Sequence, residues 1–325
     1  MRILSFAYNL EGCWWIRVKS PLEQLAKKHA VALTDGKKQF QLDGWQMVVF
    51  NNILADATRF VNGKEVTMPI PEMIADFKSK GAKIVYDTDD SHDIHPLAGA
   101  TGKLVDDNIH NYFYMLKNAD LITVTTKELA NTVRKYTKKP IAVLPNCINP
   151  ELFKERKHEN KVKIGFAGSP SHVPDLDIVM PAIYKLKEKH DIYFETLGFQ
   201  KDNCKWKKPV KINNYYEALA DLGADIGICP LLENDFNRNK SPLKFLEYSM
   251  VGTMVLASNR YPYKGEMKDE WLVDDDKWEE TLERYILDKE LREKTLKEQK
   301  EWVLQNRDIR KEYTRWEVEY RKLLK

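Results

Sequence analysis

Short apolar segments alternate with amphipathic helical patterns along most of this chain, and the alternation occurs twice. In the first half, the apolar runs predict strands at 2–7, 31–34, 47–51, 83–87, 121–125 and 141–144, with helices at 18–29, 71–80, 104–118 and 127–138. In the second half, strands are predicted at 162–167, 192–196, 210–212, 225–229 and 254–257. Such alternation is typical of α/β domains with parallel, doubly wound sheets. A chain of 325 residues is long enough for two of them.

Composition favours folded domains and argues against a general polyanion binder. Apolar residues make up 43% of the chain, and 52 basic against 49 acidic residues leave a net charge of +3. The four cysteines are scattered without metal-site spacing, which predicts free thiols in a reducing compartment. The N-terminus lacks the apolar stretch of a signal peptide, and no apolar run approaches the roughly 20 residues of a membrane span. We therefore expect a cytoplasmic protein.

The two series of elements are separated by a predicted linker. Asn149-Pro150 and the charged stretch 154–161 mark it, so we expect one Rossmann-like domain over 1–153 and a second over 154–305. Residues 306–325 predict a final helix with one apolar stripe, formed by Ile309, Tyr313, Trp316, Tyr320 and Leu323. An aromatic stripe at this spacing predicts packing against a core.

The sixteen residues 237–252 combine an anion-friendly loop with an amphipathic helix. Ser241 followed by Pro242 predicts a helix start, with Ser as N-cap and Pro at the first helical position. Such a helix directs unpaired N–H groups and a partial positive charge at whatever lies before it. Lys240 and Lys244 would meet an anionic ligand together with those groups.

Glu247 lies about one turn beyond Lys244, at the border of the apolar face, where it could accept hydrogen bonds from sugar hydroxyls. Apolar runs at 224–230 and 253–258 flank this helix and predict a βαβ unit, whose loop lies at the carboxyl edge of the sheet. Open α/β sheets bind ligands at that edge. The alternative is an ordinary crossover helix with a solvated Lys and Glu.

Several segments, taken in their order along the chain, resemble the retaining nucleotide-sugar glycosyltransferases of the two-domain GT-B fold, specifically the large family 4. The resemblance lies in the segments 83–90, 119–126, 143–153, 165–172 with 175–176, and 224–258. It implies an α/β protein with two Rossmann-like, doubly wound parallel-sheet domains that face a cleft. It also implies that the C-terminal helix crosses back to the first domain.

The resemblance further implies a sugar donor linked to a nucleoside diphosphate, with UDP as the default. The implied donor-binding residues are Gly168, Ser169, Tyr215, Asn239, Lys240, Ser241, Pro242, Leu243 and Glu247. Lys240 would neutralise the phosphates and the leaving group, Glu247 would bind the ribose, and Tyr215 or Tyr216 could stack on the base. Preorganised donors can stabilise leaving-group charge without metal or other cofactor, and we expect neither.

Asn239 departs from the family pattern. The family has paired glutamates eight positions apart, and eight positions before Glu247 this chain has the uncharged Asn239. This departure keeps open a non-catalytic nucleotide-sugar binding module as an alternative. A nicotinamide enzyme is disfavoured, because residues 7–20 offer the single glycine Gly12 instead of a Gly-x-Gly-x-x-Gly turn.

An acidic cluster follows the predicted strand 83–87 and comprises Asp87, Asp89, Asp90, His92 and Asp93. Such a set could ligate a divalent metal or form a solvated loop. Its position matches the groups that touch the transferred sugar and acceptor in the family. We therefore predict Asp89, Asp90 and His92, with Lys240, as catalytic residues.

Two kinds of hydroxyl acceptor remain open. A glycan or lipid-linked acceptor is usual for the family, and 14–17 with Lys19 form a candidate apolar, basic patch. The chain also resembles glycosyltransferases of bacterial viruses, some of which modify hydroxylated pyrimidines in DNA and would act in the host cytoplasm. Such an enzyme needs a flipped base and basic tracks, for which Lys37-Lys38 and 135–139 are candidates.

Overall fold

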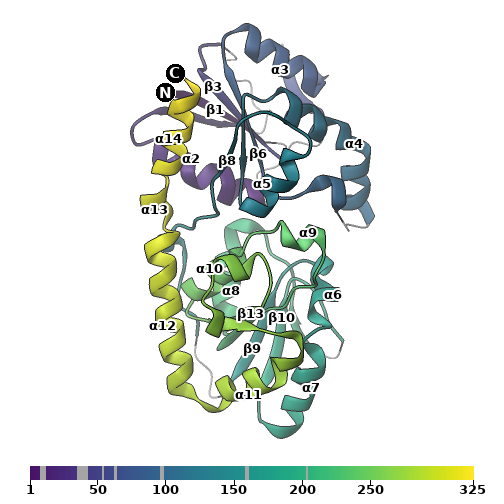
Figure 1. Ribbon diagram of the computed structural model, residues 1–325, viewed down its shortest axis with the longest axis vertical. Coiled ribbons are helices and arrows are strands. Elements are labelled where there is room, and N and C mark those ends of the chain that lie inside the picture. Colours follow the sequence, from purple (N-terminus) through teal and green to yellow (C-terminus); the bar gives the residue numbers. More distant parts are fainter. Residues whose placement is uncertain are drawn as a thin grey trace. The chain divides into compact units, whose positions relative to one another are not determined.

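The computed structural model describes residues 1–7, 12–34, 43–52, 55–61, 64–95, 99–157, 161–202 and 204–325. Its contacts divide the chain into two compact units. Unit 1 comprises Met1–Cys147, Asn239–Ser241 and Ile309–Lys325, and unit 2 comprises Ile148–Arg238 and Pro242–Asp308. Each unit contains a six-stranded sheet, and every strand pairing within the two sheets is parallel (Figure 1).

The sheet of unit 1 has the strand order β2-β1-β3-β6-β7-β8. Its strands are β1 (Arg2–Ala7), β2 (Ala30–Thr34), β3 (Met47–Asn51), β6 (Lys83–Thr88), β7 (Leu121–Val124) and β8 (Ile141–Val143). A separate antiparallel hairpin is formed by β4 (Ala57–Val61) and β5 (Lys64–Met68). In the main sheet Asn51 pairs with Asp87, so the carboxyl ends of β3 and β6 bring polar side chains together.

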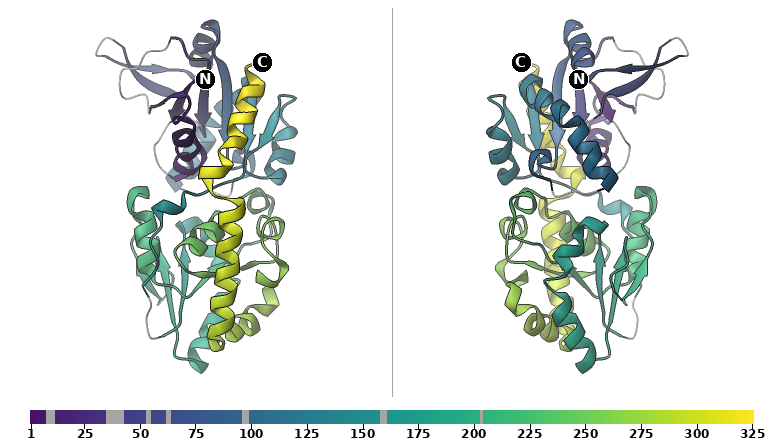
Figure 2. Two further views of the ribbon diagram at one scale, coloured as in Figure 1. Left: turned by 90° about the vertical axis from the view of Figure 1, so that its left-hand side faces the viewer. Right: turned by 90° about the vertical axis from the view of Figure 1, so that its right-hand side faces the viewer.

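Helices cover both faces of the unit 1 sheet. One face packs against α3 (Ile70–Ser79), α4 (Gly99–Asn118) and α5 (Lys127–Arg134). The other face packs against the segment formed by α1 (Gly12–Trp14), the π-helix η1 (Trp15–Lys19) and α2 (Ser20–Leu25), and against the C-terminal helices α13 (Ile309–Glu312) and α14 (Thr314–Leu323). Figure 2 shows α14, in yellow, beside this sheet. Continuous apolar strands such as β3 are buried on both sides, as expected for a parallel sheet.

The sheet of unit 2 has the order β11-β10-β9-β12-β13-β14. Its strands are β9 (Lys163–Ala167), β10 (Tyr193–Leu197), β11 (Lys205–Lys207), β12 (Ile226–Cys229), β13 (Met254–Ser258) and β14 (Leu272–Val273). Numbered within the unit, this is the order 3-2-1-4-5-6 of dinucleotide-binding folds. The order reverses between β9 and β12, which is the point where such sheets bind ligands at their carboxyl ends.

Unit 2 is also a three-layer structure. One face of its sheet packs against the short helix α6 (Val173–Leu176), against α7 (Met180–Lys189) and against α11 (Trp278–Leu287). The other face packs against α8 (Ile212–Leu222), α10 (Leu243–Met250) and α12 (Lys289–Asn306). The short helices η3 (Pro150–Leu152), η4 (Pro170–His172) and α9 (Asp235–Arg238) lie in the connecting loops, as do η5 (Tyr263–Gly265), η6 (Asp269–Trp271) and η7 (Asp275–Lys277).

The predicted architecture of two doubly wound parallel sheets is confirmed. The expected packing of the C-terminal stripe is confirmed too, since Ile309, Trp316 and Tyr320 are buried in unit 1. The strand predicted at 210–212 is wrong, because Ile212 begins α8 and the edge strand is Lys205–Lys207. An edge strand hydrogen-bonds on one side only, so three residues rich in Lys can form it without an apolar run.

Candidate functional site

The loop after β9 begins at Gly168, beside the point where the unit 2 strand order reverses. A Cβ on Gly168 would lie 2.9 Å from the Phe166 ring and 3.2 Å from the His172 ring. The neighbouring Gly198 has a φ of +111°, and a Cβ there would lie 2.1 Å from the Gly168 carbonyl oxygen. The two glycines therefore permit a close approach of the loops after β9 and β10. Ser169 is exposed, and its Oγ lies 2.7 Å from the Ser171 Oγ.

Glu247 is a buried carboxyl on α10, with 5% of its surface exposed. The Tyr215 hydroxyl, from α8, donates a hydrogen bond to Glu247 Oε2 over 3.1 Å. Burial raises the pKa of Glu247 from 4.5 to about 7, although the Lys244 charge and the Tyr215 hydrogen bond both act to lower it. Near neutral pH this carboxyl can therefore gain or lose a proton, and its ionised form is a strong acceptor for hydroxyl donors.

Tyr215 and Tyr216 belong to one aromatic group on the same side of unit 2. Their ring centroids are 5.7 Å apart, and the Tyr216 ring lies 4.3 Å from that of Phe153. The Tyr215 hydroxyl is engaged by Glu247, so this side chain positions the carboxyl. Stacking of either ring on a base stays a prediction.

Lys244, one turn before Glu247, ends a chain of polar side chains that the sequence did not reveal. Its Nζ lies 3.1 Å from His172 Nε2, and His172 Nδ1 lies 2.8 Å from Asp175 Oδ2. The other oxygen of Asp175 accepts from the Leu232 backbone N–H at 2.9 Å and from Asn237 Nδ2 at 3.1 Å. A His and an Asp three residues apart at the start of α6 were the available sequence signal.

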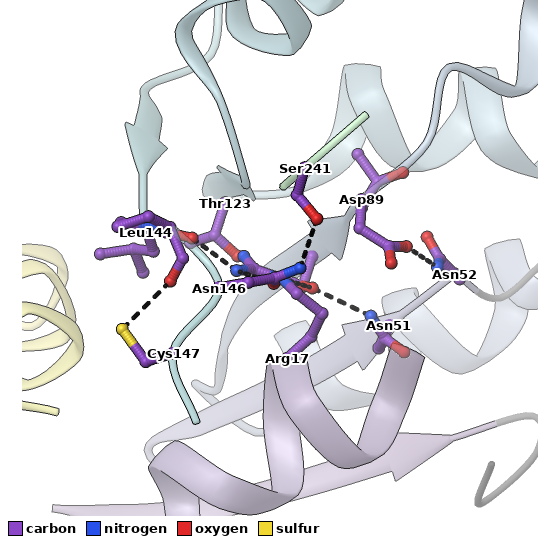
Figure 3. A network of polar contacts seen from close by, with 12 residues as sticks. Arg17, Asn51, Asn52, Asp89, Thr123, Leu144, Asn146, Cys147 and Ser241 are labelled. Atoms are coloured by element: carbon purple, nitrogen blue, oxygen red, sulfur yellow. Dashed lines mark hydrogen bonds and ion pairs between the residues drawn. The ribbon is translucent and has the colours of Figure 1, made fainter. Parts of the chain in front are cut away.

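The loop Asn239–Ser241 belongs to unit 1. Thr132 donates to Asn239 Oδ1 at 3.1 Å, and Asn146 donates to Ser241 Oγ at 2.7 Å (Figure 3). The predicted N-cap role of Ser241 is therefore wrong: α10 begins at Leu243, and no side chain caps its start. Ser241 is instead bound by a side chain of unit 1.

The remaining predicted donor residues fall in both units. Lys240 is half-buried and belongs to unit 1 with Asn239 and Ser241. Pro242 is buried and Leu243 half-buried in unit 2, the unit that contains Gly168, Tyr215 and Glu247. The donor-binding roles of these residues stay predictions.

Asp87 is the centre of a buried network at the carboxyl ends of the unit 1 strands. Arg17 contacts both of its oxygens, at 3.1 Å and 2.7 Å, Asn51 Nδ2 donates at 2.9 Å, and Thr123 Oγ1 donates at 2.6 Å. Arg17 also donates to the Leu144 carbonyl and to Asn146 Oδ1. Figure 3 shows Asn146 between Arg17 and Ser241. The sequence missed this pairing; a charged Arg17 among apolar positions of η1 was its only signal.

The predicted catalytic residues of unit 1 lie beside this network. Asn52, whose φ is +43°, donates its amide to Asp89 (Figure 3). His92 Nε2 lies 3.4 Å from the Asn52 side-chain oxygen. Burial lowers the pKa of His92 to about 4, so its imidazole is neutral at pH 7. Asp89 and Asp90 are half-buried. A positive φ at a non-glycine residue marks local strain, which is common at functional sites.

Other predicted features have a simpler structural explanation or lie outside the described residues. Trp14 is buried and donates to Ser5 Oγ at 3.2 Å, and Arg17 is buried, so neither belongs to a surface patch for lipid. Lys37-Lys38 lies outside the described residues, whereas Lys135 and Lys138 are exposed.

The described part of the chain contains neither a candidate metal site nor a candidate membrane span. No group of three or more His, Cys, Asp or Glu side chains there is arranged to hold a metal ion. Across the same residues, no helix has both the length and the apolar character needed to cross a bilayer.

Comparison with known proteins gives no sequence relative: no family model matches the chain, and no curated protein does. Solved structures match it closely in fold. An alpha-glucosyltransferase in complex with UDP and a 13-mer DNA containing a HMU base has a TM-score of 0.67 at 14% identity, with all of both chains covered. The chain has the GT-B fold of glycosyltransferases.

Further matches fit this result. The catalytic domain of starch synthase IV from Arabidopsis thaliana, bound to ADP and acarbose, has a TM-score of 0.57 at 10% identity, with 100% of this chain and 99% of that chain covered. TarM has a TM-score of 0.60 at 12% identity, with 86% of this chain and 54% of that chain covered. At these identities the likeness establishes the fold.

Proposed function

We propose that the protein is a retaining, family-4-like glycosyltransferase that transfers a sugar from a UDP-linked donor to a hydroxyl group. In this reaction the bond between the anomeric carbon and the β-phosphate oxygen breaks, and a bond to the acceptor oxygen forms with the anomeric configuration retained. The acceptor proton leaves with the released UDP. Stabilising the charge of that UDP is the main electrostatic task of the site.

The observation that carries the proposal is the buried Glu247 near the carboxyl ends of a sheet with the order 3-2-1-4-5-6. A buried carboxyl destabilises the folded protein unless something binds it. Among the described residues, the Tyr215 hydroxyl and the Lys244 charge favour the ionised form of Glu247. Ribose hydroxyls are donors of the right kind. The loop at Gly168, which we propose for the diphosphate, follows β9, beside the point where the strand order reverses.

The remaining roles follow the chemistry of the residues. Lys240 would neutralise the donor phosphates as the leaving group departs. Asp89 and Asp90 would bind hydroxyls of the transferred sugar or the acceptor. His92, neutral because of its lowered pKa, would act as a hydrogen-bonding group and would add no positive charge.

A hydroxylated pyrimidine in DNA is the acceptor that we favour. The support is the match to the alpha-glucosyltransferase solved with HMU-containing DNA, whose TM-score of 0.67 exceeds the 0.57 of the similarly complete match to starch synthase IV. The exposed Lys135 and Lys138, just after α5, would suit a phosphate backbone. A bacterial virus would be a natural source of such an enzyme, acting in the host cytoplasm. A glycan or lipid-linked acceptor is the second candidate.

The test is product formation from UDP-glucose and other UDP-sugars, offered with hydroxymethyl-pyrimidine DNA or with glycan acceptors and followed by mass spectrometry. We expect Glu247→Ala and Lys240→Ala to lose most activity. Glu188→Ala and Lys187→Met are matched controls, since both side chains are exposed on α7. Equal activity of all four variants would refute the assignment of the site.

A non-catalytic nucleotide-sugar binding module is the alternative, and Asn239 is the observation that favours it. Its side-chain oxygen accepts a hydrogen bond from Thr132, and it carries no charge where the family has a glutamate. Such a module would bind a UDP-sugar in stoichiometric amounts and release neither free sugar nor a glycosylated product. Turnover with any acceptor, or hydrolysis of the donor, would exclude it.

A further inference from the structure

A line of three polar side chains, Asp175, His172 and Lys244, lies beside Gly168 in unit 2. Asp175 is 4% exposed and is fixed by two donors, the Leu232 backbone N–H and the Asn237 amide. It accepts from His172 Nδ1 at 2.8 Å, and His172 Nε2 lies 3.1 Å from Lys244 Nζ. Each member therefore restricts the geometry of the next.

The proton positions in this line follow from its end groups. A carboxylate can only accept, so Nδ1 of His172 carries the proton that is donated to Asp175. An ammonium can only donate, so Nε2 of His172 is the acceptor for Lys244. A doubly protonated His172 would point an N–H at the ammonium 3.1 Å away, which like charges disfavour. This pattern of donors and acceptors requires the tautomer of His172 that is protonated at Nδ1, and it orients the Lys244 ammonium.

The ammonium is held at the place where the strand order reverses. His172 lies against Gly168, which follows β9, and Lys244 Nζ is 5.8 Å from the centre of the Phe166 ring of β9. Lys244 also acts electrostatically on Cys229, the last residue of β12, and on Glu247. It is the second residue of α10, whose first-turn N–H groups add positive potential.

We infer that Lys244 is a cation that receives the donor diphosphate, and that His172 and Asp175 are positioning residues that hold its ammonium for this task. The inference rests on the proposed function and adds a cation in unit 2 to Lys240. An ammonium has three rotatable donors, so Lys244 can donate to His172 and to a phosphate oxygen at once. A preset orientation lowers the entropy that a flexible lysine loses on binding.

The experiment compares UDP with uridine, which lacks the phosphates, by titration calorimetry. For Lys244→Met we expect UDP to bind about tenfold more weakly or worse, because a charge-assisted hydrogen bond is lost. Uridine should lose much less affinity, because the Lys244 charge affects its binding only through the ionisation of Glu247. Lys187→Met, which removes a positive charge from exposed α7, should bind both ligands normally. Uridine is the reference ligand for each variant. A folding defect would weaken the binding of uridine and of UDP alike and would be recognised in this way.

The positioning role is tested through His172. We expect His172→Leu to weaken UDP binding about threefold to tenfold, and His172→Gln to restore most of it, because the Gln oxygen can accept from Lys244. In the Lys244→Met background, His172→Leu should cause no further loss, since both substitutions remove one interaction. Losses that add fully in the double variant would overturn the positioning role.

The outcomes distinguish a failure of the proposed function from a failure of the inference about Lys244. If the wild type binds no UDP, the proposed function fails and the inference fails with it. If the wild type binds UDP and Lys244→Met binds it equally well, the inference alone is overturned.

Discussion

Glu247→Gln should stabilise the protein in a pH-dependent manner. The substitution keeps an oxygen that accepts from Tyr215 and removes the buried negative charge. The difference between the ordinary pKa of 4.5 and the folded pKa of about 7 corresponds to about 3 kcal/mol, since one pH unit is about 1.4 kcal/mol. The largest cause of that difference is burial, which disfavours the charged form.

The sign follows from where the proton is lost. Below pH 4.5 the carboxyl is protonated in the folded and the unfolded chain, so Glu and Gln should differ little. Between pH 4.5 and 7 the unfolded chain loses its proton first, so the stability of the wild type falls as the pH rises. The Gln variant escapes this loss, and we expect it to be more stable by about 1 kcal/mol at pH 5 and about 3 kcal/mol at pH 8.

The assay is urea unfolding of both proteins at the two pH values. Glu188→Gln is the control, because this exposed side chain on α7 should change the free energy of unfolding by less than about 0.5 kcal/mol at either pH. A Glu247→Gln variant that is no more stable than the wild type at pH 8 would refute the reasoning. So would a stability gain of equal size at pH 5 and pH 8.

The same substitution should weaken donor binding. Only the ionised Glu247 offers a charged acceptor to ribose, so the affinity of the wild type for UDP should rise between pH 6 and pH 8, by up to about tenfold. The Gln variant should bind UDP more weakly and lack this component of the pH dependence. Comparing the two by calorimetry separates the ionisation of Glu247 from that of UDP itself. Parallel pH profiles would argue against a ribose contact.

Three further outcomes are expected. Arg17→Met should lower the free energy of unfolding in urea by about 3 to 5 kcal/mol, because it leaves the buried Asp87 carboxylate without its cation. The control is Arg321→Met, which removes an exposed Arg from its pair with Glu317 and should change the free energy of unfolding by about 0.5 kcal/mol or less. Gly198→Ala should destabilise by about 2 kcal/mol or more in the same assay, since its Cβ would meet the Gly168 carbonyl at 2.1 Å and its φ is +111°. Transfer activity should persist in EDTA, and its loss with recovery on adding a divalent cation would show that a metal is required.

The layered fold could be predicted because buried parallel strands appear as unbroken apolar runs. Strands β3 and β13 are buried at every residue, and both stood out in the sequence. The edge strand β11 did not, because Lys205 and Trp206 are exposed, Lys207 is half-buried, and two of the three residues are charged. Its place in the sheet depends on parallel pairing with β10, which is a property of the folded chain.

The candidate site was predictable where its residues are neighbours in sequence. Glu247 and Lys244 are three residues apart on one helix, and their shared position at the sheet edge followed from the flanking strands. The contact of Lys244 with His172 joins residues 72 positions apart, and that of Arg17 with Asp87 joins residues 70 apart. Side-chain pairs at such separations depend on how strands are ordered in the sheet, which periodicity alone does not give.

The hydrogen bonds of unit 1 also decide which carboxylates of the acidic cluster can act on a substrate. Asp87 accepts from three side chains and is buried, so its role is to hold Arg17 and the ends of three strands together. Asp93 accepts from the hydroxyls of Tyr136 and Ser91. A carboxylate that is already saturated with donors gains little from a sugar hydroxyl.

Asp89 differs because it is half-buried. It accepts hydrogen bonds from the Asn52 amide and the Cys13 thiol, and Asn52 also lies next to the neutral His92. A substrate hydroxyl could therefore bind Asp89 without breaking the core of the sheet. Asp89→Asn should lower transfer activity while leaving the free energy of unfolding nearly unchanged. Asp87→Asn should instead lower the free energy of unfolding. Equal loss of stability in both variants would contradict this division between a structural and a substrate-binding carboxylate.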